Sequence, residues 1–84
     1  MKYPMVYVEW LDSAFHAGWK TESERRPDSY SLSTCNTLGF LVFKSKREIH
    51  VAMQFSECGS VGEVMAIPRS VIRRMVKVSP SRSN

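Results

Sequence analysis

A strict alternation of apolar and other side chains over residues 48–55 constrains this chain more than any other feature. One face of that segment would carry Ile49, Val51, Met53 and Phe55. A period of two is typical of a β-strand with one buried face. Residues 5–11 alternate in the same way, whereas residues 12–30 sustain no helical period. The pattern therefore predicts an all-β domain.

Five strands are predicted along the chain, over Met5–Leu11, Tyr30–Phe43, Glu48–Phe55, Glu63–Ile67 and Arg73–Val78. A long loop follows the first strand, a polar turn covers residues 44–47, and a second loop covers residues 56–62. Pro68 cannot donate a ladder hydrogen bond, so the fourth strand ends there. Residues 69–72 are too few for an α-helix and suit one 3₁₀ turn. Gly39 marks a bend or bulge where no side chain fits.

The order of these elements resembles an SH3-like (Sm-like) five-stranded small barrel, with a long first loop and a short 3₁₀ turn before the last strand. An OB-like barrel is the alternative, although it would normally have a clearer helix after its third strand. A length of 84 residues allows one domain. We assign residues 1–78 to the barrel and residues 79–84 to a flexible polar tail. The expected core includes Val8, Trp10, Val51 and Met53.

The formal net charge of +4 is unevenly distributed. Residues 1–42 sum to −1 and residues 43–84 to +5. This bias favours anionic partners. The longest apolar run, residues 38–43, is far shorter than the roughly 20 residues that span a bilayer. We therefore expect a cytoplasmic protein with no membrane partner.

Catalytic and metal-binding patterns are weak in this sequence. Cys35 and Cys58 lack the spacing of a zinc site, so we interpret them as reduced thiols. Two alternatives stay open, a Cys35–His50 dyad and a metal site completed by His16 and His50. No nucleophile elbow accompanies these residues. We predict no enzyme, no cofactor and no metal.

Basic residues near aromatic ones give the strongest functional signal. They occur in the long loop (Arg25, Arg26), in the 44–47 turn (Lys44, Lys46, Arg47) and in the last strand (Arg73, Arg74, Lys77). Arginine and aromatic planes together bind bases and phosphates without a sequence code. The predicted ligand-binding residues are Trp19, Arg25, Arg26, Tyr30 and Arg74, around a groove between the long loop and the barrel. The loop with Gly59 and Gly62 could contact a phosphate, but a hairpin loop that needs a positive φ explains it better.

A second resemblance rests on several short motifs: residues 8–13 (VEWLDS), Gly18-Trp19, residues 35–41 (CNTLGFL), Ile67-Pro68 and Ile72. Together they resemble a group of short bacteriophage or prophage proteins of unassigned activity. The resemblance implies an accessory protein in the cytoplasm of a bacterial host.

The leading hypothesis is a non-enzymatic module that binds an anionic nucleotide-type ligand or a nucleic-acid backbone. One version sequesters a host signalling nucleotide. The alternative is a protein-interaction module that inhibits or redirects a host protein. We also expect a homo-oligomer with the apolar first strand as its seam, and a long loop anchored to the barrel by Phe15 and Trp19.

Overall fold

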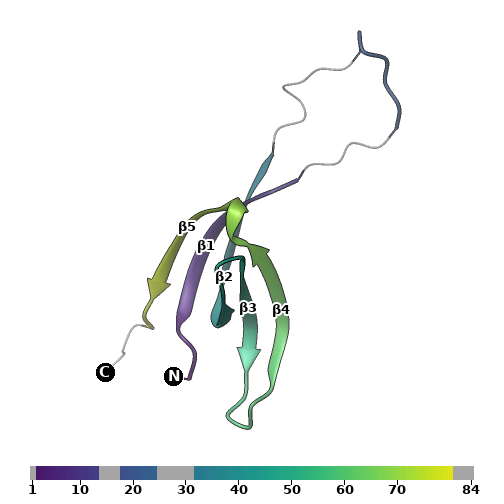
Figure 1. Ribbon diagram of the computed structural model, residues 1–84. Helices are drawn as coiled ribbons and strands as arrows, with labels where there is room; N and C mark the ends of the chain where they lie inside the picture. The colour runs from purple at the N-terminus through teal and green to yellow at the C-terminus, as the bar shows by residue number, and fades with distance from the viewer. Residues whose placement is uncertain (1, 14–17, 25–31, 81–84) are drawn as a thin grey trace.

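The computed structural model describes residues 2–13, 18–24 and 32–80. Five strands form one antiparallel sheet (Figure 1). They are β1 (Met5–Asp12), β2 (Ser33–Lys44), β3 (Glu48–Phe55), β4 (Val61–Pro68) and β5 (Ile72–Val78). A 3₁₀ turn, η2 (Arg69–Val71), joins β4 to β5. The predictions of an all-β fold, five strands and a 3₁₀ turn before the last strand are confirmed, and the bounds of β3 agree in full.

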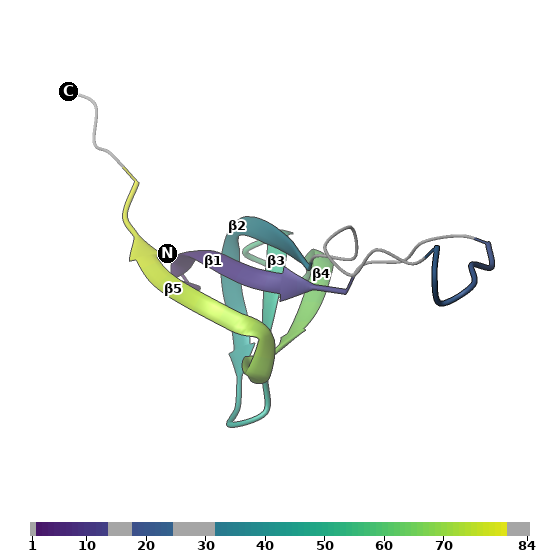
Figure 2. The same ribbon diagram turned by 90° about the horizontal axis from the view of Figure 1, so that it is seen from above.

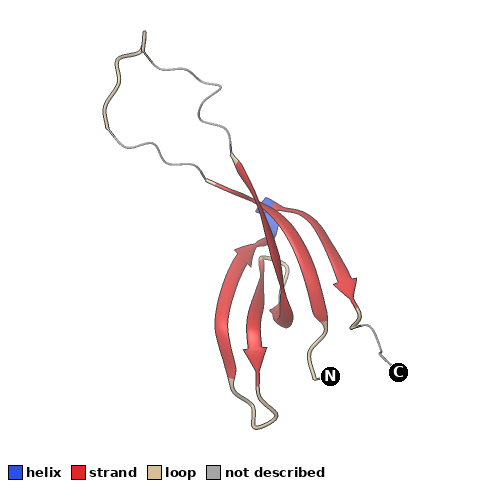
Figure 3. Ribbon diagram, turned by 180° about the vertical axis from the view of Figure 1, so that it is seen from behind, coloured by secondary structure: helices blue, strands red, loops and turns tan. Residues whose placement is uncertain are grey.

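The strands are arranged in the order β4-β3-β2-β1-β5. Figures 2 and 3 show β4 and β5 at the two edges of a curved sheet. Strand β1 pairs with β2 on one side and with β5 on the other. Its backbone groups are therefore already used by β2 and β5, so β1 offers no free edge to a second copy. The oligomeric state itself stays a prediction.

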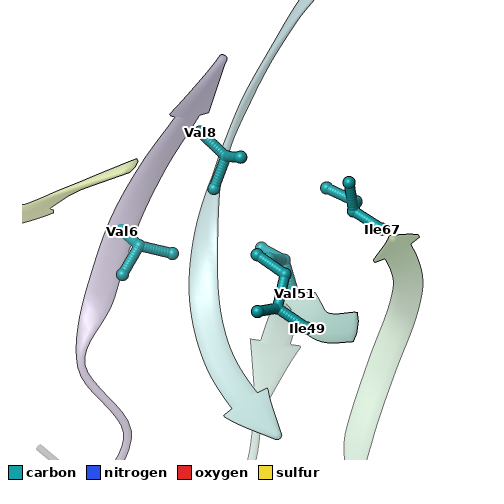
Figure 4. Close-up of a cluster of buried hydrophobic side chains, with 5 residues drawn as sticks. All are labelled: Val6, Val8, Ile49, Val51 and Ile67. Carbon is teal, nitrogen blue, oxygen red and sulfur yellow. The ribbon is translucent and has the colours of Figure 1, made fainter. Parts of the chain in front are cut away.

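The core is a small cluster of five apolar side chains from three strands: Val6 and Val8 of β1, Ile49 and Val51 of β3, and Ile67 of β4. They point toward one another across the concave side of the sheet (Figure 4). Strands β1 and β4 are separated by two other strands in the sheet, so the sheet must curl to bring these side chains together.

The expected core residues had different outcomes. Val8 and Val51 are buried as predicted. Trp10 is partly buried against the cluster, and its indole N–H donates to Thr37 Oγ1 at 2.9 Å. The prediction for Met53 was wrong, because its side chain is 71% exposed. From β3, only Ile49 and Val51 belong to the cluster. The alternation of apolar residues in the sequence continues to Met53, but the core does not extend that far.

Gly39 marks a close approach between β2 and β3. A Cβ atom at Gly39 would lie 2.7 Å from both the Ala52 carbonyl oxygen and Val51 Cγ1. No side chain fits there, as predicted. The bulge itself lies elsewhere, between Leu41 and Phe43, where the register of β2 against β3 shifts.

The β3–β4 hairpin uses two positive φ angles. Gly59 has φ of +100°, as expected for a glycine in the loop. The second positive φ, +56°, belongs to Glu63 rather than to Gly62. A non-glycine residue in this region is uncommon and interrupts the regular extended backbone of the edge strand β4.

Residues 18–24 lie apart from the sheet in Figure 1. Trp19 is fully exposed, so the prediction that it anchors the long loop was wrong. An aromatic ring is not forced into the core when the core is already filled by aliphatic side chains. Phe15 and residues 81–84 lie outside the described residues. The division into one domain and a tail stays a prediction.

The close approach at Gly39 generates the first testable prediction. Gly39→Ala forces its methyl group against backbone and a buried valine, so we expect a loss of about 1–3 kcal/mol in the free energy of unfolding. Gly62→Ala is the matched control, because its Cβ would meet the side-chain amide of Gln54, at 2.8 Å. That exposed side chain can turn away. Urea denaturation measures both variants, and equal stability of the two would contradict the packing described for Gly39.

Candidate functional site

The residues that the sequence predicts for ligand binding lie in separate places. Trp19 is exposed in the segment 18–24, away from the sheet. Arg74 lies on β5 opposite Glu9 of β1. Arg25, Arg26 and Tyr30 lie outside the described residues. The described structure therefore does not bring Trp19 and Arg74 together, and the role of the five residues stays a prediction.

Arg74 belongs to a polar network on the convex face of the sheet. Its Nη1 lies 3.5 Å from Glu9 Oε1. The Tyr7 hydroxyl lies 3.0 Å from the same carboxylate oxygen and 3.0 Å from Asn36 Oδ1. The Glu9 side chain is half-buried and is shared by two partners, Tyr7 and Arg74. One carboxylate thus joins β1 to β5.

This network changes the acidity of Tyr7. The hydrogen bond to Glu9 raises the pKa of the Tyr7 hydroxyl above its ordinary value of 10.0, and partial desolvation and the negative charge of Glu9 act in the same direction. The positive charge of Arg74 lowers this pKa, but by less. Tyr7 therefore remains a neutral donor at physiological pH.

A second cluster is built around the turn between β2 and β3. Ser45 Oγ accepts hydrogen bonds from the backbone N–H groups of Arg47 and Glu48, each at 3.2 Å. Arg69 of η2 is hydrogen-bonded to the same turn. Its backbone N–H donates to the Arg47 carbonyl at 2.9 Å, and its Nε donates to the Ser45 carbonyl at 2.8 Å. Arg69 thus lies beside Ser45 and Arg47, although more than twenty positions separate it from them in the sequence.

Five cations line a series of three surface hollows that share residues with one another. Arg69, Lys46 and Lys44 line the first hollow, Lys44 and Lys77 the second, and Lys77 and Lys2 the third. No acidic side chain lines any of the three. We call these five residues, Lys2, Lys44, Lys46, Arg69 and Lys77, the basic track.

The positive charges of the basic track are not neutralised within the described residues. The contacts there that could neutralise charge are Arg74–Glu9 and the contact of His50 with Glu48, and neither includes a residue of the track. Lys77 lies opposite Val6, which faces the core, whereas Arg74 lies opposite Glu9 on the convex face. The two cations of β5 therefore project from opposite faces of the strand. The track is distinct from the Glu9 network.

Sequence reasoning identified part of the basic track without choosing it as the site. Lys44, Lys46 and Lys77 were recognised as basic residues of the turn and the last strand. Arg69 and Lys2 were missed, because only the tertiary fold brings η2 to the turn and the N-terminal residues to β5. The excess charge of residues 43–84 was the available signal.

Neither alternative based on cysteine and histidine is supported by the fold. Cys35 pairs with Trp10 near one end of β2, and His50 pairs with Phe43 near the other. The dyad is thus excluded by the register of the strands. Among the described residues, no three His, Cys, Asp or Glu side chains gather as a metal site. His16 lies outside the described residues.

Comparison with family models, curated proteins and solved structures finds no match to this chain. Within residues 2–13, 18–24 and 32–80, no helix has the length and apolar character needed to cross a membrane.

The Glu9 network generates the second testable prediction. In Glu9→Gln the Tyr7 hydroxyl loses its anionic acceptor, so we expect the Tyr7 pKa to fall toward its ordinary value. In Arg74→Ala we expect it to rise further, because the opposing positive charge is removed. Titration of tyrosinate absorbance, with Tyr7→Phe to assign the signal, measures both shifts. A Tyr7 pKa that is the same in wild type and Glu9→Gln would contradict the network.

Proposed function

We propose that this protein is a non-enzymatic binding module for the phosphate backbone of a nucleic acid. The observation that carries the proposal is the basic track, in which five cations and no acidic residue line three connected hollows. A polymer with one negative charge on each nucleotide can engage such a track along its length. Each neutralised phosphate releases condensed counterions, which favours binding.

The shape of the track favours a polymer over a small nucleotide. The hollows follow one another from η2 and the β2–β3 turn to the N-terminal residues and β5. The phosphates of a mononucleotide lie close together and would reach only part of this series. A nucleotide-type ligand, including a host signalling nucleotide, is therefore the less favoured version of the hypothesis.

We also propose that the curled sheet is an SH3-like barrel. The strand order β4-β3-β2-β1-β5 and the position of η2 between the two edge strands support it. Two hydrogen bonds hold Arg69 of η2 against the β2–β3 turn. They support a binding site whose cations are brought together by this architecture. A phage accessory role in the bacterial cytoplasm remains the setting that the sequence motifs suggest.

A protein-interaction module is the second candidate, and one observation favours it. The edge strand β4 exposes Val61, Val64 and Met65, and Trp19 is exposed as well. Exposed apolar side chains on an unpaired edge are features of protein-binding surfaces. They do not account for the basic track, so we place this candidate second.

A matched pair of β5 variants tests the proposed function. Lys77→Gln and Arg74→Gln each remove one positive charge, the first from the basic track and the second from the convex face. We expect Lys77→Gln to weaken binding to a labelled oligonucleotide and to reduce the slope of log K against log salt by about 0.7–0.9. Arg74→Gln should change the slope much less. Fluorescence anisotropy over a range of salt concentrations measures both.

Two results would contradict the proposal. Equal weakening by the two variants would mean that binding follows net charge and does not use the track. Absence of binding by the wild-type protein at low salt, to oligonucleotides and to nucleotides, would favour the protein-interaction candidate.

A further inference from the structure

Phe43 is an aromatic residue at the centre of the basic track. It lines the same hollow as Lys44 and Lys77, and its side chain is 48% exposed. Phe43 therefore adds accessible apolar surface to a hollow that two cations also line.

One neighbour holds the Phe43 ring in place. The His50 ring packs against it, with 4.6 Å between the ring centroids and a tilt of 35°. His50 is itself held by a 2.6 Å contact between its Nε2 and Glu48 Oε2. Phe43 and His50 also face each other in the register of β2 and β3. The ring is thus backed by a positioned partner, which reduces the entropy lost when a ligand stacks on it.

A second aromatic residue lies in the adjoining hollow. Tyr3 lines it together with Lys2 and Lys77. The Tyr3 ring meets Phe55 edge-on at 5.2 Å, and Lys2 Nζ lies 5.4 Å from its centroid. Each of these two hollows is therefore lined by one aromatic residue and two cations.

We propose that the basic track takes single-stranded nucleic acid, with Phe43 as a platform on which a base stacks. The inference rests on the proposed function and names its substrate class. Bases of a duplex are stacked on one another and cannot reach a side-chain ring, whereas bases of a single strand can. Cations that bind the backbone beside rings that bind base faces are the combination that single-strand binding uses.

The test compares three ligands on the full chain at low salt: labelled oligothymidine, a duplex of the same length, and inorganic polyphosphate as a competitor without bases. Phe43→Leu keeps an apolar side chain against His50 but removes the aromatic plane. We expect it to weaken oligothymidine binding by a factor of about five or more. Competition by polyphosphate should remain as in wild type, and Phe43→Tyr should retain wild-type affinity.

Trp19→Leu is the matched comparison, because Trp19 is an exposed aromatic residue that lines none of the three hollows. If Trp19→Leu loses affinity for oligothymidine and Phe43→Leu keeps it, the assignment of Phe43 as the stacking platform is wrong. Equal affinity of wild type for duplex and single strand would overturn the substrate class. Failure of the proposed function looks different, because the wild-type protein would then bind neither polyphosphate nor any oligonucleotide.

A measurement on the wild-type protein covers the case in which Phe43→Leu does not fold. Ultraviolet crosslinking of oligothymidine, followed by mass spectrometry of the peptides, locates the base contact directly. We expect the crosslink on the peptide that contains Phe43. Crosslinks confined to the peptide that contains Trp19 would overturn the proposal.

Discussion

The structure depends on the close approach of β2 to β3 at Gly39. Gly39 carries no Cβ atom, and a Cβ atom there would collide with the backbone of Ala52. The glycine therefore lets the two strands pack tightly enough for the sheet to curl. The curl brings Ile67 of β4 toward Val6 and Val8 of β1, and this small cluster is the core. A core of five residues gives a domain of this size little surplus stability.

The same curl arranges the charges. It brings η2 to the β2–β3 turn, where Arg69 is held by two backbone carbonyl groups. The side chains of β5 then divide between two electrostatic environments: Arg74 is paired with Glu9, while Lys77 joins the basic track. A charge count along the sequence cannot separate these roles, because neighbouring residues of one strand lie on opposite faces.

Much of the fold was predictable because β-strands carry local signals. The alternation over residues 48–55 gave the bounds of β3, Pro68 marked the end of β4, and Gly39 was recognised as a position without room for a side chain. Met53 shows where local reasoning stops: alternation assigns a face, but only the tertiary arrangement decides how far the core covers it. Glu63 shows the same limit of local reasoning. It takes the positive φ that the sequence would assign to the neighbouring Gly62.

The candidate site was less predictable than the fold. The sequence pointed to cations and aromatic rings together, and four of the five cations of the basic track lie in the half of the chain that carries the excess positive charge. It favoured Trp19 as an aromatic partner, because a tryptophan in a long loop is conspicuous. Phe43 was hidden in a strand, next to the bulge between Leu41 and Phe43 that the sequence did not locate, and it is 48% exposed.

The pairing of β1 with β5 has a consequence for how the chain acquires its structure during synthesis. Met5 lies opposite Val78, so the first strand to leave the ribosome receives its second neighbour from the last. β2 and β3 can pair with their neighbours earlier, but until β5 emerges β1 presents an unpaired edge, which is a template for wrong pairing. Completion of the sheet therefore waits for β5, the last of the five strands to be synthesised.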